Sequence, residues 1–147
     1  MPNTGTTEPN DVLPEWSTRT IAVLATVDEG PLAIPVSAPV RMGDRRILLS
    51  LHSSRGSLSR LRRRPEVALA VLTAGNVAFT ARGRASVVQE PMAAASDYAA
   101  VAIDVEQIDD HRQPEFLVEA GVDRRWLDVA ARDALGERVR ALTGLAS

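Results

Sequence analysis

The stretch SRGSLSRLRR, residues 54–63, decides the fold of this chain because it joins two apolar, strand-like runs at residues 47–51 and 66–72. Its leucines fall on one side of a short helix, which we predict over residues 57–64. Pro65 ends that helix, since a proline disfavours helical geometry in the residue before it. The opening turn contains no acidic residue. The positive end of the helix therefore favours an anion such as a phosphate.

Apolar or alternating runs predict six β-strands, most of them joined by turns. They cover residues 20–27, 32–40, 46–52, 66–72, 77–88 and 101–106. Pro35 and Pro39 cannot donate to a strand ladder, so the second strand is expected at a sheet edge. Further helices are predicted at residues 92–100 and 125–142. The pattern favours a mainly β protein of the α+β class, built on a small antiparallel barrel with a short helix between strands three and four and a C-terminal helix.

The composition is that of one ordinary globular domain. Of the 147 residues, 45% are apolar and 24% are charged, and the net charge of -2 gives no overall attraction to nucleic acid or acidic lipid. The absence of cysteine excludes thiolate chemistry and favours a cytoplasmic location. We expect a flexible segment at residues 1–18, a single domain at residues 19–147, and no signal peptide or membrane-spanning stretch.

Arg55 is the first candidate binding residue. It lies in the opening turn of the predicted helix, where the helix dipole disfavours a cation by roughly 0.3–1 kcal/mol and no nearby acid offsets it. Free backbone N–H groups at Gly56 and Ser57, with the hydroxyls of Ser54 and Ser57, would complete a phosphate site. The alternatives are that Ser53 or Ser54 simply caps the helix and that the neighbouring arginines form a solvated face.

An ordered pattern of residues extends this interpretation. It comprises Ser50, Ser54-Arg55, the leucine-bearing helix, Pro65, AVLATV at residues 22–27, Gly30-Pro31, Ile34-Pro35-Val36 and RGRA at residues 82–85. Over residues 20–108 this order resembles the pyridoxamine 5'-phosphate oxidase superfamily, the FMN-binding split β-barrel proteins and their deazaflavin-dependent relatives. The resemblance implies a six-stranded antiparallel split β-barrel and a homodimer with cofactor sites at the subunit interface.

The resemblance also implies positions for the cofactor. The strand hydroxyl and the Ser-Arg pair hold the flavin phosphate in that superfamily, and its lysine position is Gly56 here, so one phosphate cation is missing. In that superfamily the isoalloxazine ring lies along the second and third strands, which implies contacts here from Pro35, Val36, Ser37 and the backbone near Leu49. His52, next to the phosphate loop, either contacts the ligand or is a surface histidine. The candidate cofactor-binding residues are Pro35, Val36, Ser37, Leu49, Ser50, His52, Ser54, Arg55, Gly56 and Ser57.

The favoured function is an FMN- or deazaflavin-dependent oxidoreductase that acts on a small organic substrate. The alternative is a non-catalytic protein that binds flavin, haem or a lipid-like ligand on the same barrel, an interpretation that the missing lysine favours. No residue stands out as a catalytic acid or base. Two histidines are too few for a recognisable metal site, and residues 109–112 (DDHR) are expected to form a solvated turn. Nucleic-acid binding is disfavoured because the arginine run lacks interleaved aromatic residues.

Overall fold

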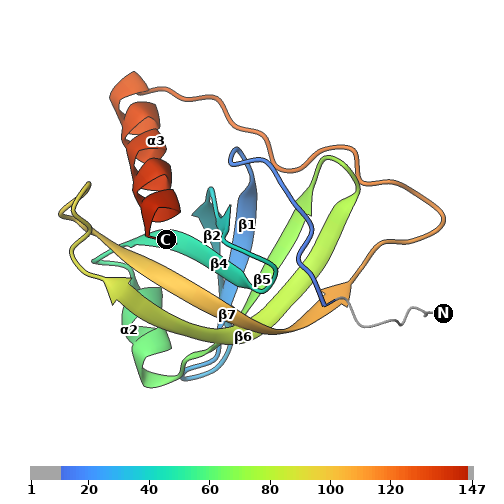
Figure 1. The fold of residues 1–147 in the computed structure, drawn as a ribbon, viewed down its shortest axis with the longest axis horizontal. Helices are drawn as coiled ribbons and strands as arrows, with labels where there is room; N and C mark the ends of the chain where they lie inside the picture. Colours follow the sequence, from blue (N-terminus) through green and yellow to red (C-terminus); the bar gives the residue numbers. More distant parts are fainter. Residues whose placement is uncertain (1–10, 146–147) are drawn as a thin grey trace.

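The computed structural model describes residues 11–145, which form one curved antiparallel sheet and two helices (Figure 1). The strands are β1 (Ile21–Thr26), β2 (Leu32–Ser37), β3 (Val40–Arg41), β4 (Arg46–His52), β5 (Glu66–Thr73), β6 (Val77–Gln89) and β7 (Tyr98–Asp110). The helices are α2 (Gly56–Arg63) and α3 (Val129–Gly144). The predicted α+β class, the antiparallel barrel and the positions of both helices are confirmed.

The order of strands in the sheet is β2-β1-β5-β6-β7-β4-β3, with every pairing antiparallel. β2 therefore lies at one edge, as its prolines predicted. The sheet curls until β2 contacts β4, although the two strands do not pair. The barrel is thus split along this line, and backbone groups of β2 are left without a ladder partner on that side.

The sheet has seven strands in place of the predicted six. The predicted second strand divides into β2 and the two-residue β3, which pairs with β4 at the other end of the sheet. Ala38 adopts a positive φ of 56°, and Pro39 has no N–H to donate, so the ladder breaks between the two strands. The two prolines predict irregularities within one strand, whereas Pro39 lies where the chain passes from pairing with β1 to pairing with β4.

β7 begins earlier and ends later than expected. Residues 92–100 were predicted as a helix, but this segment contains turns and an isolated bridge, and its last three residues already belong to β7. Residues 109–110, predicted to lie in a solvated turn, pair with β6 at Phe79 and Thr80. The expected strand at residues 101–106 was too short because residues 98–100 pair with β4 and residues 107–110 pair with β6.

The barrel encloses the main hydrophobic core. Aliphatic side chains dominate it, among them Leu24, Leu49, Leu69 and Ile103, which are almost wholly buried. α2 contributes its two leucines to this core, so the helix is attached to the barrel through the apolar face that the sequence predicted.

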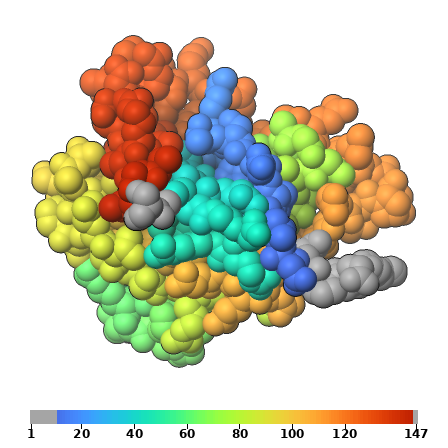
Figure 2. All heavy atoms as spheres, viewed as in Figure 1, coloured from blue at the N-terminus to red at the C-terminus, as the bar shows by residue number. Residues whose placement is uncertain are grey.

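α3 packs outside the barrel, against β3, β4 and the loop before β7 (Figure 2). Its buried residues are Leu135 and Leu142. The helix was predicted to begin at residue 125, but Asp128 caps it by accepting hydrogen bonds from the N–H groups of Ala130 and Ala131, and Leu127 is exposed. Neither helix in the described part of the chain has the length and hydropathy needed to cross a bilayer.

The chain before β1 is only partly described. Residues 1–10 of the segment expected to be flexible lie outside the described residues. Leu13 is 1% exposed and belongs to the barrel core, and its N–H donates to the carbonyl of Asp44. The indole of Trp16 donates to the carbonyl of Pro39 at 2.8 Å and packs on Phe79. Residues 11–18 therefore cover one side of the barrel.

Candidate functional site

A pocket of about 400 Å³ lies along the split between β2 and β4. Its lining residues are Ile21, Pro35, Val36, Ser37, Ser50, Leu51, His52, Arg55, Tyr98, Arg124 and Arg138. The volume is within the range of roughly 300–1,000 Å³ that is typical of small-molecule sites. Apolar side chains from β1, β2 and β4 form part of the wall, and polar and cationic groups form the rest.

Three guanidinium groups reach this pocket from three different parts of the chain: Arg55 before α2, Arg124 before α3, and Arg138 on α3. None of the described residues that line the pocket is acidic. Arginine stays protonated at any pH at which the protein is folded, so the pocket carries permanent positive charge. Charge of this kind, gathered in one hollow without a lining carboxylate, favours an anionic ligand.

Arg55 occupies the N-cap position of α2, with extended backbone and without a side-chain cap for the helix. The first turn of α2 contains no acidic residue. The Arg55 guanidinium donates to the carbonyl of Pro35 at 3.0 Å, which ties the start of α2 to the unpaired edge of β2. This bond uses one of the five N–H groups of the guanidinium and leaves others for a ligand.

Arg138 and Arg124 each hold a serine of the pocket. Nε of Arg138 donates to the hydroxyl of Ser50 at 3.3 Å, and its guanidinium lies 3.8 Å from the ring centroid of Tyr98. Partial burial lowers the pKa of Arg138 below its usual value, while Tyr98 acts in the opposite direction. Nη1 of Arg124 donates to the hydroxyl of Ser37 at 2.8 Å.

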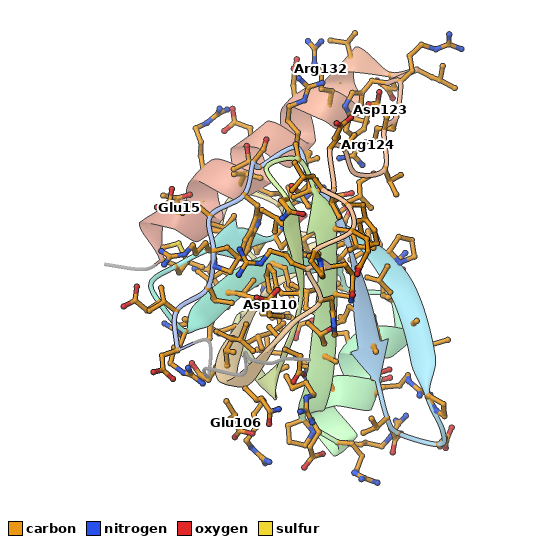
Figure 3. The ribbon with its side chains drawn as sticks, turned by 90° about the vertical axis from the view of Figure 1, so that its right-hand side faces the viewer. Glu15, Glu106, Asp110, Asp123, Arg124 and Arg132 are labelled. Carbon is orange, nitrogen blue, oxygen red and sulfur yellow. The ribbon has the colours of Figure 1, made fainter. Side chains whose placement is uncertain are left out.

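Arg124 belongs to the segment between β7 and α3, which runs along the upper edge of the view in Figure 1 to the start of α3. Arg124 lies at the same end of the molecule as Arg132 in the first turn of α3 (Figure 3). Its guanidinium is 4.5 Å from the ring centroid of Trp126, a cation–π contact within the same segment. The neighbouring Asp123 accepts a hydrogen bond from the backbone N–H of Arg124.

His52 lies on the rim of the pocket. Its Nδ1 accepts a hydrogen bond from the N–H of Ser54 and lies 2.7 Å from the Ser54 hydroxyl. Its ring meets Tyr98 edge to face at 5.1 Å between centroids, in agreement with the pairing of these two residues across β4 and β7. These contacts orient the imidazole and hold the loop before α2 in place.

Six of the ten predicted cofactor residues line the pocket. They are Pro35, Val36, Ser37, Ser50, His52 and Arg55. Leu49 points into the core and is wholly buried, so its side chain is turned away. Ser54 and Gly56 are exposed next to the pocket without lining it. Ser57 is 2% exposed, and its hydroxyl has no hydrogen-bond partner among the described residues.

The sequence interpretation missed Tyr98, Arg124 and Arg138. Tyr98 was placed in a helix that does not form, and Arg124 lies in an extended segment with no periodicity to interpret. Arg138 carried a signal, since it is three residues after Leu135 and four before Leu142. An arginine at that spacing falls on the buried face of the helix. A cation on an apolar face indicates a polar partner or ligand below it.

The remaining arginines near α2 have other roles. Arg60 donates to the hydroxyl of Thr26 at 2.8 Å, Arg62 pairs with Glu90, and Arg63 pairs with Asp28. They fasten α2 to β1, to the β1–β2 turn and to the end of β6. Arg62 and Arg63 are exposed, as the predicted solvated face requires, and each also forms an ion pair at the surface.

The donor set was tested against a phosphate-bearing flavin-type cofactor. The guanidinium, hydroxyl and imidazole groups that line the pocket suit a phosphate, and Ile21, Val36 and Leu51 offer apolar surface to a flat ring. The start of α2 adds an uncapped helix end without acidic residues. The residues present therefore fit such a group. Within residues 11–145 no cluster of three potential metal ligands occurs.

Comparisons with models of known protein families and with curated proteins find no match. Among solved structures, a pyridoxamine 5'-phosphate oxidase-like protein from Lactobacillus delbrueckii matches with a TM-score of 0.57 and 17% identity, over 67% of this chain and 93% of that chain. A similar protein from Listeria innocua matches with a TM-score of 0.53 and 14% identity, over 63% of this chain and 89% of that chain. An F420 reductase matches with a TM-score of 0.53 and 15% identity, over 67% of this chain and 100% of that chain.

These likenesses establish the fold. The chain has the split β-barrel fold of the pyridoxamine 5'-phosphate oxidase-like proteins, and the resemblance seen in the sequence is confirmed at that level. Solved structures with this fold include an F420 reductase as well as the oxidase-like proteins.

Proposed function

We propose that this protein binds FMN or a deazaflavin coenzyme in the pocket between β2 and β4 and serves as an oxidoreductase for a small organic substrate. The observation that carries the proposal is the pocket itself. Its described lining residues include three arginines, no acidic residue and Ser50, the strand serine predicted to hold the phosphate. The fold shared with oxidase-like proteins and with an F420 reductase supports the same assignment.

The residues of this chain would bind and orient the cofactor. Ser50 and Arg55 would hold the phosphate by hydrogen bonds, two of them charge-assisted on a bidentate guanidinium. Pro35 and Val36 would support one face of the ring along the edge of β2. When bound, the flavin or deazaflavin supplies hydride transfer. The apolar walls would exclude water from that reaction.

Titration of the purified protein with FMN, and separately with F420, tests this proposal. We expect saturable binding of at least one of them, detected as a change in the visible absorption of the cofactor. We further expect NADH or NADPH to reduce bound FMN, or reduced F420 to be reoxidised when an acceptor substrate is supplied. Failure of both cofactors to bind at high micromolar concentration would refute the proposal.

Arg55→Ala should weaken binding of the phosphate-bearing cofactor by roughly 1.5–3 kcal/mol, a factor of about 10 to 150. Arg62→Ala is the matched control, since Arg62 lies on the same helix but pairs with Glu90 at the surface. The control should bind the cofactor as the original protein does. Equal effects of the two variants on the dissociation constant would show that Arg55 does not bind the cofactor.

A second candidate is a non-catalytic protein that binds flavin, haem or a lipid-like ligand. The feature that favours it is Gly56 at the lysine position of the superfamily, which leaves the start of α2 with one cation fewer. Tight binding of FMN without reduction by any nicotinamide donor, or binding of haem alone, would support this candidate over the enzyme.

We also propose a cytoplasmic homodimer whose cofactor sites lie at the subunit interface. Large apolar side chains before α3, among them Leu117 and Val122, are more than half exposed on the single chain. Burial of such side chains in a second subunit would stabilise the pair. Light scattering combined with size-exclusion chromatography tests this, and a monomer at every concentration would contradict it.

A further inference from the structure

Arg138 combines contacts that join α3 to the proposed phosphate position. Nε donates to the hydroxyl of Ser50, and the guanidinium covers the ring of Tyr98. A hydroxyl that accepts a hydrogen bond from a guanidinium still has its own proton to donate. A phosphate oxygen bound by Ser50 would therefore lie next to the remaining N–H groups of Arg138.

The charge of Arg138 is not balanced by a carboxylate in the pocket. Its polar partner there is a neutral hydroxyl, its aromatic partner is a neutral ring, and none of the described lining residues is acidic. Two further arginines line the same hollow, so the three cations repel one another. A dianionic group would relieve that repulsion and would replace the hydration that Arg138 loses on burial.

The start of α2 lacks a cation where the superfamily pattern has a lysine. Gly56 is exposed, and a Cβ there would meet no atom within 4 Å. The space is open and the charge is absent. Arg138 brings a cation to Ser50 from a different element, α3.

We infer that Arg138 is a phosphate-binding residue of this pocket and supplies the second cation that Gly56 does not. This inference rests on the proposed function, because the ligand is the phosphomonoester of the flavin-type cofactor. It makes α3, which packs outside the barrel, a part of the cofactor site. The C-terminal helix thereby determines selectivity for the phosphorylated form of the cofactor.

The competing explanation is that Arg138 only attaches α3 to the sheet. α3 is also held by Leu135 and Leu142, so a substitution at residue 138 leaves its apolar contacts intact. The two explanations differ in one respect. An attachment role affects FMN and riboflavin equally, whereas a phosphate contact affects FMN alone, because riboflavin lacks the phosphate.

The test compares Arg138→Gln and Arg138→Lys with the control Arg132→Gln, an exposed arginine of α3 that pairs with Asp133. Quenching of flavin fluorescence gives the dissociation constants for FMN and riboflavin. Arg138→Gln should reduce the preference for FMN over riboflavin by roughly tenfold to a hundredfold. Arg138→Lys should retain most of the preference, and Arg132→Gln all of it. An unchanged ratio in Arg138→Gln would overturn the inference.

Phosphorus NMR gives a readout that does not depend on the strength of helix packing. The second pKa of a phosphomonoester is near 6, and nearby cations lower it. The phosphate of bound FMN should titrate at lower pH in the original protein than in Arg138→Gln. Identical titration curves would show that Arg138 does not contact the phosphate.

Failure of the proposed function can be told apart from failure of this inference. If FMN and F420 do not bind at all, thermal unfolding in inorganic phosphate against chloride of equal ionic strength tests the anion site alone. Stabilisation by phosphate that is lost in Arg138→Gln supports Arg138 as an anion ligand. Stabilisation that is absent, or that persists in the variant, refutes it.

Discussion

Arg138 on α3 donates a hydrogen bond from Nε to the hydroxyl of Ser50 on β4, at 3.3 Å and across 88 residues of sequence. This bond connects the serine that the family resemblance predicts as a phosphate ligand with a helix that packs outside the barrel. The candidate site therefore has two parts. β4 and the start of α2 form the local part, and the C-terminal region forms the distant part.

Gly56→Lys should tighten binding of FMN. The position is open, and a lysine there would place an ammonium at the start of α2. We expect a gain of about 1 kcal/mol or more, roughly fivefold or more in affinity, since a charged hydrogen bond is among the strongest polar contacts. Gly56→Ala adds a Cβ without charge and serves as the control. A lysine variant that binds FMN no better than the alanine variant would mean that the phosphate lies elsewhere.

Inorganic phosphate should raise the melting temperature more than chloride at equal ionic strength. A ligand that binds the folded state alone stabilises it in proportion to the logarithm of its concentration. Phosphate also stabilises proteins in general by exclusion from their surface, so the comparison must include Arg55→Ala. The difference between phosphate and chloride should shrink in that variant. A difference of the same size in both proteins would point to the general effect alone.

Gly83→Ala should destabilise the barrel by about 1–3 kcal/mol or more. Gly83 lies at a register shift between β6 and β7, where a Cβ would come within 2.1 Å of the carbonyl oxygen of Asp104. Gly136→Ala provides the contrast, because its Cβ would have open space inside α3. That variant should gain about 0.5–1 kcal/mol from helix propensity. Urea denaturation measures both, and a neutral Gly83→Ala would show that the two strands can separate at this point.

Asp109→Asn should lower stability at neutral pH but leave it unchanged in acid. A hydrogen bond from Arg82 is the main cause that holds the pKa of Asp109 below its usual value. A carboxyl with a lowered folded-state pKa stabilises the protein above its unfolded-state pKa, near 3.9, and loses that contribution as the pH falls through the folded value. The loss should be small because the pair is partly exposed.

Denaturation of the original protein and Asp109→Asn across pH tests this expectation. The two unfolding curves should differ at pH 7 and converge below the ordinary range of an aspartate. Glu106→Gln, an exposed position on the same strand, is the control for loss of a surface charge. If the difference in unfolding free energy between the two proteins persists in strong acid, the ion pair is not its cause.

Much of the fold followed from local pattern. The apolar run of β4 predicts a strand, the small-residue loop after it predicts the start of a helix, and Pro65 predicts the end of that helix. Ser50 and Arg55, which the family resemblance predicts as phosphate ligands, both line the pocket. The two-residue β3 was missed because Ala38 adopts a positive φ that its residue type does not announce.

The distant part of the site was beyond local pattern. Tyr98 lines the pocket only because β7 pairs with β4 in the register that sets it opposite His52. Arg124 arrives through an extended segment whose path depends on tertiary contacts, such as the hydrogen bonds between Asn76 and Val118. Of these three residues, only Arg138 could have been predicted from the sequence, because it is an arginine at helical spacing between the buried Leu135 and Leu142 of α3.

The most direct measurement is a crystal structure of the protein grown with saturating FMN. The account predicts the phosphate in the pocket between β2 and β4, with its oxygens about 3 Å from the Ser50 hydroxyl and from the guanidinium groups of Arg55 and Arg138. The ring should lie along β2 at Pro35 and Val36. A phosphate bound at another place, or a pocket without FMN at saturating concentration, would contradict it.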